Sequence, residues 1–234
     1  GKRFGSNAVL DELSIEFVPG EIVALIGLNG AGKTTLMRLL AGIVAPTRGT
    51  LRMDGIAFSR NDLATRRRLV FLPDFPPSLP GASVIEHLAL VLRLHVREVD
   101  PAAVVRVLGD LDLLALAEAP IATLSRGQAY KTALAALILV APDLWLLDEP
   151  FASGMDAQGL AMLKHHARAA AAAGASVIYS TQILEIAERF SHRLLVLDRG
   201  AIALSLSAAE LAALPRDGDG ALEARLRAFR QDQA

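Results

Sequence analysis

Apolar residues along this chain follow two patterns that predict different elements. Short, mostly apolar runs occupy residues 22–26, 69–72, 144–147, 176–180 and 193–197. Runs of this length are typical of strands buried on both faces, as in the middle of a parallel sheet. Between them, apolar positions recur every three or four residues, which predicts helices. This alternation indicates an α/β fold with a mostly parallel sheet.

The helical pattern is longest in the middle of the chain. We expect helices at residues 33–41, from 83 to about 117, and from 125, 156 and 182 onward. Within the long stretch, Asp100 and Pro101 fit an N-cap followed by a first-turn proline. The block between 83 and about 140 therefore predicts a helical subdomain inserted into the α/β core.

Two segments nearer the N-terminus predict antiparallel β structure. Residues 13–18 alternate apolar and polar side chains as one strand does. Residues 50–58 fit a hairpin with Asp54 and Gly55 at its turn. We expect one domain, with a core at about 1–74 and 141–214 and the helical subdomain at about 75–140. An amphipathic pattern at 220–231 predicts a C-terminal helix within 215–234.

Composition excludes several classes of protein. The 234 residues carry a net charge of −1 and no cysteine, so we expect no disulfide framework, no thiolate metal site and no nucleic-acid partner. The three consecutive arginines at 66–68 fit a solvated helix end. The longest uncharged apolar stretch, residues 132–142, is well short of the roughly 20 residues that span a bilayer. We therefore expect neither a membrane span nor a signal peptide.

A glycine-rich loop follows the first buried strand. Residues 27–35 read GLNGAGKTT, which matches the phosphate-binding pattern G-x-x-x-x-G-K-[ST] between a strand and a helix. Backbone N–H groups in such a loop attract phosphates, Lys33 supplies charge for the β and γ phosphates, and Thr34 supplies a hydroxyl for Mg²⁺. The alternative is a glycine-rich turn, but motif and context together favour a P-loop NTPase core that binds nucleotide. The predicted nucleotide-binding residues here are Asn29, Gly30, Ala31, Gly32, Lys33, Thr34 and Thr35.

Two carboxylates end another buried strand. Residues 144–150 read LWLLDEP, and the carboxyl ends of parallel strands face the crevice where such folds bind ligands. Asp148 is placed to hold Mg²⁺, and Glu149 to activate or orient a water opposite the γ phosphate. The alternative is that the two acids lie on a solvated turn. The presence of the phosphate loop makes this alternative the weaker interpretation.

A serine begins the helix predicted from residue 125. Ser125 and Gln128 fit a capping box ahead of an apolar run, which is a sufficient structural explanation. An exposed helix N-terminus with Ser125 and Gly127 is also an anion site. Neither spacing nor composition decides between these two roles.

Together these residues resemble a family, the nucleotide-binding subunits of ATP-binding cassette (ABC) transporters. GLNGAGKTT and LLDEP stand as that family has them, and LSRGQ at 124–128 resembles its signature LSGGQ. SGMD at 153–156 resembles the loop that bridges two subunits, and Phe4 in KRFG matches the aromatic that stacks on adenine. The resemblance extends from Phe4 to about residue 214, and the short helical segments with LPDFPPSLPGASVIEHL look most like ATPases of bacterial exporters.

The resemblance implies how such a subunit works. Two subunits, identical or different, pack head to tail, with each ATP held between one phosphate loop and the partner's signature helix. Ser125, Gly127 and Gln128 would then contact ATP bound by the partner's loop, and Asp156 would lie at the bridging loop. Hydrolysis with Mg²⁺ would move integral membrane subunits, which places the chain at the cytoplasmic side of the cell membrane as a peripheral subunit.

Three positions depart from the family pattern. Arg126 replaces the first glycine of the signature, Asp74 stands where glutamine is usual, and Gln182 stands where histidine senses the γ phosphate. Asp74 joins Thr34 and Asp148 as a candidate Mg²⁺ ligand, and Gln182 joins Glu149 as a candidate catalytic residue. Capping of the following helix is the alternative role for Gln182. His192 lies ten residues on, past the next helix, so we do not expect it to substitute.

These departures leave more than one function open. The main hypothesis is a transport ATPase, with slow hydrolysis or an asymmetric pair that includes a more active partner. A regulatory cassette that binds ATP with little hydrolysis is the alternative. A soluble cassette of DNA repair or translation would show a coiled-coil insertion, a tandem cassette or a basic face, and this chain has none of them.

Overall fold

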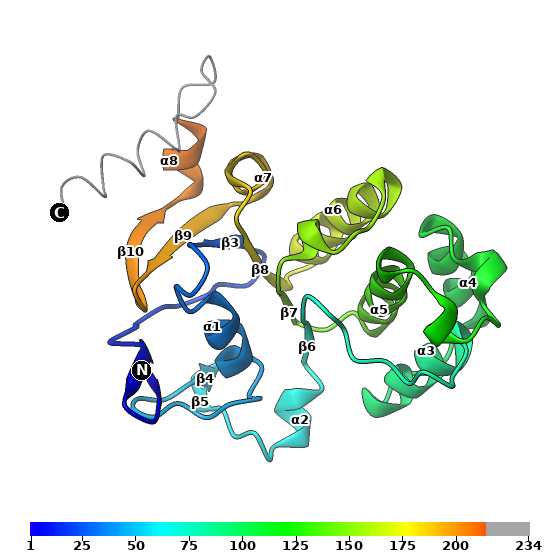
Figure 1. Ribbon diagram of the computed structural model, residues 1–234, viewed down its shortest axis with the longest axis horizontal. Helices are drawn as coiled ribbons and strands as arrows, with labels where there is room; N and C mark the ends of the chain where they lie inside the picture. Colours follow the sequence, from blue (N-terminus) through cyan, green and yellow to red (C-terminus); the bar gives the residue numbers. More distant parts are fainter. Residues whose placement is uncertain (214–234) are drawn as a thin grey trace.

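The computed structural model describes residues 1–213, and its centre is a six-stranded sheet (Figure 1). The strands lie in the order β10-β9-β3-β8-β7-β6. Their bounds are β3 (Ile22–Ile26), β6 (Leu69–Leu72), β7 (Leu144–Leu147), β8 (Ser176–Thr181), β9 (Arg193–Asp198) and β10 (Ala201–Leu206). All neighbours pair in parallel except β10, which is antiparallel to β9. The predicted α/β class and its five buried strands are confirmed.

Strand β3 lies near the middle of the sheet and is fully buried. Ile22, Ala24 and Ile26 belong to one hydrophobic cluster, whereas Val23 and Leu25 belong to a second cluster on the opposite face. Alternate side chains of a strand point to opposite faces, so β3 needs apolar residues at every position. This explains why its sequence is a continuous apolar run.

Helices cover both faces of the sheet (Figure 1). Their bounds are α1 (Lys33–Leu40), α2 (Leu63–Arg66), α3 (Val84–Leu94), α4 (Pro101–Asp110), α5 (Arg126–Val140), α6 (Ala157–Ala172), α7 (Leu184–Phe190) and α8 (Ala208–Ala212), with 3₁₀ turns η1 (Leu114–Leu116), η2 (Ile121–Thr123) and η3 (Pro150–Ala152). Helix α1 packs on the cluster that contains Val23, and α5, α6 and α7 pack on the one that contains Ile22. Among residues 1–213, none of these helices combines the length and apolar content that crossing a membrane requires.

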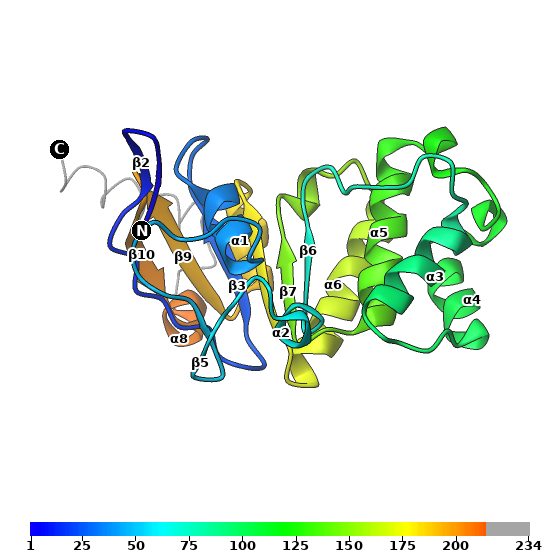
Figure 2. The ribbon, with the colours of Figure 1, turned by 90° about the horizontal axis from the view of Figure 1, so that it is seen from below.

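The helical subdomain lies at one end of the molecule, beyond β6 and β7 (Figure 2). The helical stretch expected from 83 to about 117 is divided, because α3 ends at Leu94 and α4 begins at Pro101. Asp100 caps α4 as predicted, since its Oδ1 accepts from Ala102 N at 2.9 Å. A capping box formed by Ser83 and Glu86 begins α3. The division into core and helical subdomain remains an interpretation of this arrangement.

Two small antiparallel hairpins form the N-terminal β portion. Strands β1 (Lys2–Phe4) and β2 (Asn7–Leu10) make the first, and β4 (Arg52–Met53) and β5 (Ile56–Ala57) the second. The hairpin predicted at 50–58 is confirmed, with Asp54 and Gly55 both at positive φ in its turn. Positive φ at both turn residues matches the right-handed twist of the strands.

The strand predicted at residues 13–18 is wrong. The segment is extended and buries Leu13, Ile15 and Phe17 partly against the sheet, so its alternation of faces is real. The segment and the β4–β5 hairpin both line a cavity of about 830 Å³. A ladder needs a neighbouring strand about 4.8 Å away, and here none is in place.

Near the C-terminal end, the structure contains one strand that was not predicted, and one predicted helix lies outside the described residues. Strand β10 has no counterpart in the predicted strands, although Arg199 and Gly200 form a two-residue turn at positive φ between β9 and β10. That turn and the short alternating run after it were the signal for β10. The C-terminal helix expected within 215–234 lies outside the described residues.

Candidate nucleotide-binding site

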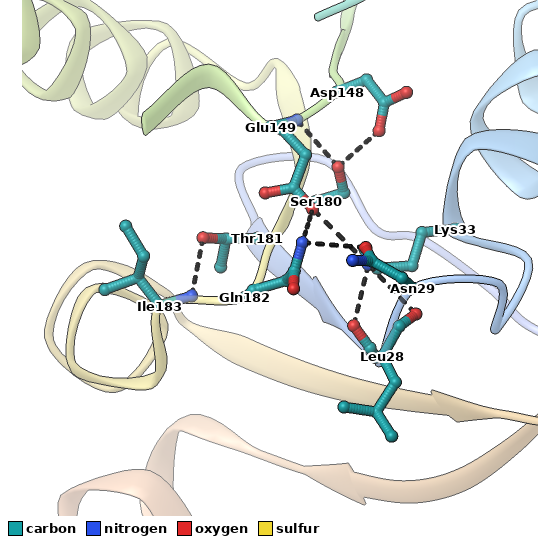
Figure 3. A network of polar contacts seen from close by, with 10 residues as sticks. Leu28, Asn29, Lys33, Asp148, Glu149, Ser180, Thr181, Gln182 and Ile183 are labelled. Carbon is teal, nitrogen blue, oxygen red and sulfur yellow. Dashed lines mark hydrogen bonds and ion pairs between the residues drawn. The ribbon is translucent and has the colours of Figure 1, made fainter. Parts of the chain in front are cut away.

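Three neighbouring strands bring the predicted site residues together. In the sheet β3, β8 and β7 are adjacent and parallel, so their carboxyl ends meet at one edge. The phosphate loop follows β3, Asp148 and Glu149 follow β7, and Gln182 follows β8 (Figure 3). These residues lie far apart in sequence, and the sheet order alone explains why they converge.

The phosphate loop has the backbone that its sequence predicts. Gly32 is the N-cap of α1 with φ 107°, a conformation that favours glycine. A Cβ there would also lie 2.7 Å from Leu10 Cδ2 in β2, so the N-terminal hairpin packs directly against the loop. Phe4 lies on this same hairpin and is half exposed, with Lys2 Nζ 4.9 Å from its ring centroid. Phe4 pairs with Asn7 at the turn of this hairpin, and its role in stacking on a base stays a prediction.

Lys33 points its ammonium group back into the loop. Its side chain is buried, and Nζ donates to Gly27 O at 2.8 Å and to Leu28 O at 3.4 Å. The same ammonium lies 3.4 Å from Glu149 Oε1. Lys33 therefore links the loop to the carboxylate at the end of β7.

Gln182 contacts the same carboxylate from the other side. Its Nε2 donates to Asn29 Oδ1 at 3.1 Å and makes a longer contact, 3.5 Å, with Glu149 Oε1 (Figure 3). It does not cap α7, because the N-cap is Ile183 and the side chain that accepts from Ile183 N is Thr181. The capping interpretation of Gln182 is wrong, and its amide belongs to the site.

His192 lies at the opposite end of the sheet. Its Nδ1 accepts from the backbone N–H of Ile22, the first residue of β3, at 3.1 Å. The phosphate loop follows the last residue of β3. The expectation that His192 does not substitute for a histidine at position 182 is confirmed by this placement.

Asp148 is buried in a hydrogen-bond relay that includes Ser180. Ser180 Oγ donates to Asp148 Oδ1 at 2.6 Å and accepts from Glu149 N at 2.8 Å. This leaves Asp148 Oδ2 without a protein partner in the described part of the chain. Ser180 is a site residue that sequence reasoning missed, and its signal was a polar residue ending a strand otherwise buried.

Glu149 has an uncommon backbone conformation. Its φ and ψ are 49° and 46°, in the left-handed region that few residues other than glycine adopt. Pro150 follows, and a proline disfavours the right-handed helical region for the residue before it. The turn directs the Glu149 carboxylate towards Lys33 and Gln182 rather than along the strand.

The signature segment has internal reasons for its residues. Ser125 and Gln128 form both arms of the predicted capping box of α5, at 3.2 and 2.9 Å. A Cβ at Gly127 would lie 2.2 Å from Gly154 O, so close packing against the loop before α6 requires glycine there. The contact of these residues with nucleotide stays a prediction, separate from these structural roles.

Asp156 and Asp74 each bind a basic residue of α5. Asp156 caps α6 through Gly159 N, and its Oδ2 lies 2.7 Å from Lys131 Nζ, whose hydrogen bond lowers the pKa of Asp156. Asp74 Oδ1 lies 2.5 Å from Arg126 Nη2. The structure thus pairs two of the three residues that depart from the family pattern.

The donor set fits Mg²⁺ held together with a nucleotide. Among residues 1–213, no group of three or more carboxylate, histidine or cysteine side chains is placed to hold a metal ion. Mg²⁺ is commonly bound by one or two carboxylates plus substrate phosphates, so such a group is not needed. Asp148 Oδ2 and the Thr34 hydroxyl at the start of α1 supply suitable oxygen ligands.

Comparisons with known proteins agree with this geometry. A profile of the family described as "ABC transporter" matches residues 10–152. "Nod factor export ATP-binding protein I" of Paraburkholderia xenovorans (strain LB400) is 35% identical over 85% of this chain, which spans 66% of that relative's length. "Aliphatic sulfonates import ATP-binding protein SsuB 1" of Xanthomonas axonopodis pv. citri (strain 306) is 36% identical over 99% of this chain and 91% of its own.

Solved structures show the same fold. One described as "Structure of ATP binding subunit of ABC transporter" superposes with a TM-score of 0.80 and 28% identity, and covers 87% of this chain and 85% of its own. A dimeric bacterial ABC transporter cassette superposes with a TM-score of 0.74 at 22% identity, over 86% of this chain and 90% of its own. The predicted fold, a nucleotide-binding core with an antiparallel N-terminal portion and an inserted helical block, is confirmed.

Proposed function

The chain belongs to the ABC transporter family of ATP-binding cassettes, which are ATPases, and on that premise we propose that it binds and hydrolyses ATP with Mg²⁺ to drive membrane transport subunits. The observation that carries the proposal is the convergence of Lys33, Glu149 and Gln182 at one edge of the sheet. A lysine inside a glycine loop, a carboxylate opposite it and a buried aspartate beside it are the groups that phosphoryl transfer needs.

ATP binding exchanges the partners of Lys33. The phosphates enter the loop, and the Lys33 ammonium that contacts Gly27 O and Glu149 Oε1 turns to phosphate oxygens. Glu149 loses a positive neighbour and becomes a better proton acceptor for the attacking water. Gln182 keeps its link to Asn29 and offers its amide to the γ phosphate.

Asp148 and Thr34 hold Mg²⁺ in this proposal, and Asp74 is a further candidate ligand. Bound there, the metal supplies positive charge that offsets the charge of the phosphates. Ser180 donates to one Asp148 oxygen, so that the other oxygen is the one left to bind a metal ion. The same serine hydroxyl holds the Glu149 backbone, which fixes the two carboxylates relative to each other.

A second cassette completes the site. Ser125, Gly127 and Gln128 would contact ATP held by the partner's phosphate loop, Asp156 would lie at the bridging loop, and Phe4 would stack on adenine. The exposed start of α5 supports this arrangement, because helix N-terminal N–H groups favour a phosphate. Integral membrane subunits would receive the motion at the cytoplasmic side of the membrane.

Export is the direction that we propose. The names of several relatives that match over 85% of this chain describe export, as in the Nod factor proteins, whereas the sulfonate relative is named for import. Vesicles containing the cognate membrane subunits test the direction, since an exporter moves substrate away from the face where ATP is added. Movement towards that face would overturn this part of the proposal.

Glu149→Gln tests the catalytic part of the proposal. The amide keeps the size of the side chain but cannot accept a proton, so ATP binding should survive while turnover falls by about two orders of magnitude or more. Turnover by phosphate release and dimerisation by light scattering with ATP are the measurements, with the exposed Glu98→Gln as control. Parental turnover in Glu149→Gln would remove Glu149 as the base, and a parental protein that binds ATP without turnover would point to a regulatory cassette instead.

A further inference from the structure

An ion pair joins the loop after β6 to the first residue of α5. Arg126 Nη2 lies 2.5 Å from Asp74 Oδ1, and the Arg126 guanidinium carbon lies 4.4 Å from the ring centroid of Phe75. Asp74 and Phe75 therefore hold the same guanidinium through two different interactions. The partners are 52 positions apart in sequence, so the contact fastens the helical subdomain to the nucleotide-binding core.

The pair lies next to the carboxylates of the site. Strand β6 pairs with β7, and Asp148 N donates to Leu72 O at 2.8 Å, only two residues before Asp74. Tyr130 lies one helical turn after Arg126 and is fully buried, and its hydroxyl has no partner among the described residues. Burial, and then the charges of Asp148 and Asp74, raise the pKa of Tyr130. The pairing of β6 with β7 thus places Asp74 near Asp148.

Charge explains why the two departures occur together. A carboxylate at position 74 that faced the γ phosphate alone would repel it, because like charges in a partly dehydrated site destabilise each other. Arg126 neutralises that carboxylate across the subdomain boundary. Conversely, Asp74 gives Arg126 a partner at the start of a helix, where a positive charge is unfavourable.

We propose that Arg126 is a positioning residue for Asp74, and that Arg126 and Mg²⁺ compete for the Asp74 carboxylate. The inference rests on the proposed function, since it assigns control of the Mg²⁺ site to a residue of the signature helix. When Asp74 turns to the metal, Arg126 is released, and the start of α5 loses a contact with the core. Mg²⁺ binding in one part of the cassette thereby changes how firmly the signature segment is held.

A double-mutant cycle tests the pair without nucleotide. Arg126→Gln keeps a long polar side chain without charge, and Asp74→Asn keeps the shape of the carboxylate. In the absence of Mg²⁺ and ATP, the double variant should melt no lower than the less stable single variant, because either substitution already breaks the pair. Arg189→Gln, at an exposed arginine that pairs with Glu185 within α7, controls for the loss of one positive charge and one surface ion pair. Melting shifts that simply add would show that the pair is not formed and would overturn the proposal.

A Mg²⁺ titration tests the competition. The measurement is binding of a non-hydrolysable ATP analogue as Mg²⁺ is raised. Arg126→Gln should lower the Mg²⁺ concentration for half-maximal binding about two- to fivefold, which is the range expected for releasing an exposed ion pair. Asp74→Asn should raise that concentration, and Arg126→Gln should then have no further effect.

Failure of the proposed function and failure of the competition for Asp74 give different results. If the parental protein and all variants fail to bind the analogue with Mg²⁺, the proposed function fails, while the melting cycle still reports the ion pair. If all bind the analogue with the same Mg²⁺ midpoint, the proposed function stands and the competition is overturned. A shift in Asp74→Asn without one in Arg126→Gln would also overturn it, because Asp74 would then act independently of Arg126.

Discussion

Gln182 occupies a position where a neutral amide joins two parts of the site. It donates to Asn29 of the phosphate loop and contacts Glu149, but it cannot carry a positive charge or pass a proton near neutral pH as imidazole can. We therefore expect the binding geometry to be maintained and the stabilisation of developing charge to be weaker than with histidine at this position. The amide explains why we expect this cassette to hydrolyse ATP slowly.

Gln182→His should raise turnover at unchanged ATP affinity. The gain should be on the order of tenfold, since a group that can transfer a proton or carry charge is added at an otherwise unchanged site. Turnover and analogue affinity of the dimer are the measurements, with Gln158→His on α6 as the control. A fast parental enzyme that the histidine does not improve would show that the site works without it.

Tyr130 and Tyr179, the two tyrosines of the chain, make a matched pair of buried phenols. Tyr179 Oη lies 2.7 Å from Ser191 Oγ, whereas the Tyr130 hydroxyl has no partner among residues 1–213. Tyr179→Phe should therefore lower the free energy of unfolding by about 1 kcal/mol, and Tyr130→Phe should leave it unchanged or raise it. Urea unfolding at pH 8 is the measurement. Equal losses in the two variants would show that Tyr130 has a partner after all.

Tyr130 and Tyr179 also predict how the stability of the protein changes at alkaline pH. Burial raises the pKa of both phenols, so the folded state prefers them neutral. Their contribution to stability is complete below the pKa of the unfolded chain, about 10, and is lost as pH rises above it. Each Phe variant should therefore lose less stability between pH 9 and pH 11 than the parental protein.

Some residues of the site could be found in the sequence and others could not. The phosphate loop and the Asp148–Glu149 pair follow apolar runs directly, so local context identifies them. The Arg126–Asp74 contact joins segments 52 positions apart, and Ser180 acquires its role from the neighbouring strand. Such contacts depend on strand order, which periodicity does not determine.

At the scale of elements, α5 and α6 are joined by one buried lysine. Lys131 is 3% exposed, and its partner is Asp156, the N-cap of α6. The signature helix and the loop before α6 are therefore held together by an ion pair and by the close approach of Gly127 to Gly154. Removing the acid leaves a buried positive charge unpaired, which is costly.

Asp156→Ala and Asp156→Asn separate the cap from the charge. Alanine loses both and should lower the free energy of unfolding by about 1 to 2 kcal/mol for the cap, with a further loss for Lys131. Asparagine keeps the cap, so Asp156→Asn should lose only the contribution of the ion pair with Lys131. Chemical unfolding at pH 7 is the measurement, and equal stability of Asp156→Ala and the parental protein would contradict the assignment.

Acidic pH should weaken the ion pair between Asp156 and Lys131. The hydrogen bond from Lys131 lowers the pKa of Asp156, so the stabilisation is complete above the unfolded-state value of about 3.9. It is lost as pH falls through the lower pKa of the folded protein. The stability difference between parental protein and Asp156→Asn should accordingly disappear in that acidic range.

Helices and strands could be predicted where burial determined the pattern of apolar residues. β3 and β7 lie inside the sheet, so their runs are apolar at nearly every position. Residues 13–18 have the alternation of a strand without a partner, because periodicity indicates which side chains are buried but not whether a second strand is adjacent. The capping boxes of α3 and α5 are local and could be predicted from sequence alone, as the one at Ser125 was.

At the scale of the molecule, the sheet order determines which residues meet at the candidate site. It places the phosphate loop, the paired carboxylates and Gln182 at one edge, and it leaves the helical subdomain at the far end beyond β6. The Asp74–Arg126 pair crosses between these parts. If nucleotide binds at this edge as we propose, the Asp74–Arg126 pair is the contact that would transmit its binding to α5.

The central claim is that Lys33 holds the phosphates of ATP. Its ammonium already lies among Gly27 O, Leu28 O and Glu149 Oε1, so phosphate oxygens replace existing oxygen partners. The most direct measurement is calorimetric titration of Mg²⁺ and ATP into Lys33→Ala, with Lys164→Ala on α6 as the matched control. We predict that Lys33→Ala weakens ATP binding by about one to two orders of magnitude, because hydrogen bonds between charged groups are lost. We predict no change in the control. Unchanged affinity in Lys33→Ala would contradict the account.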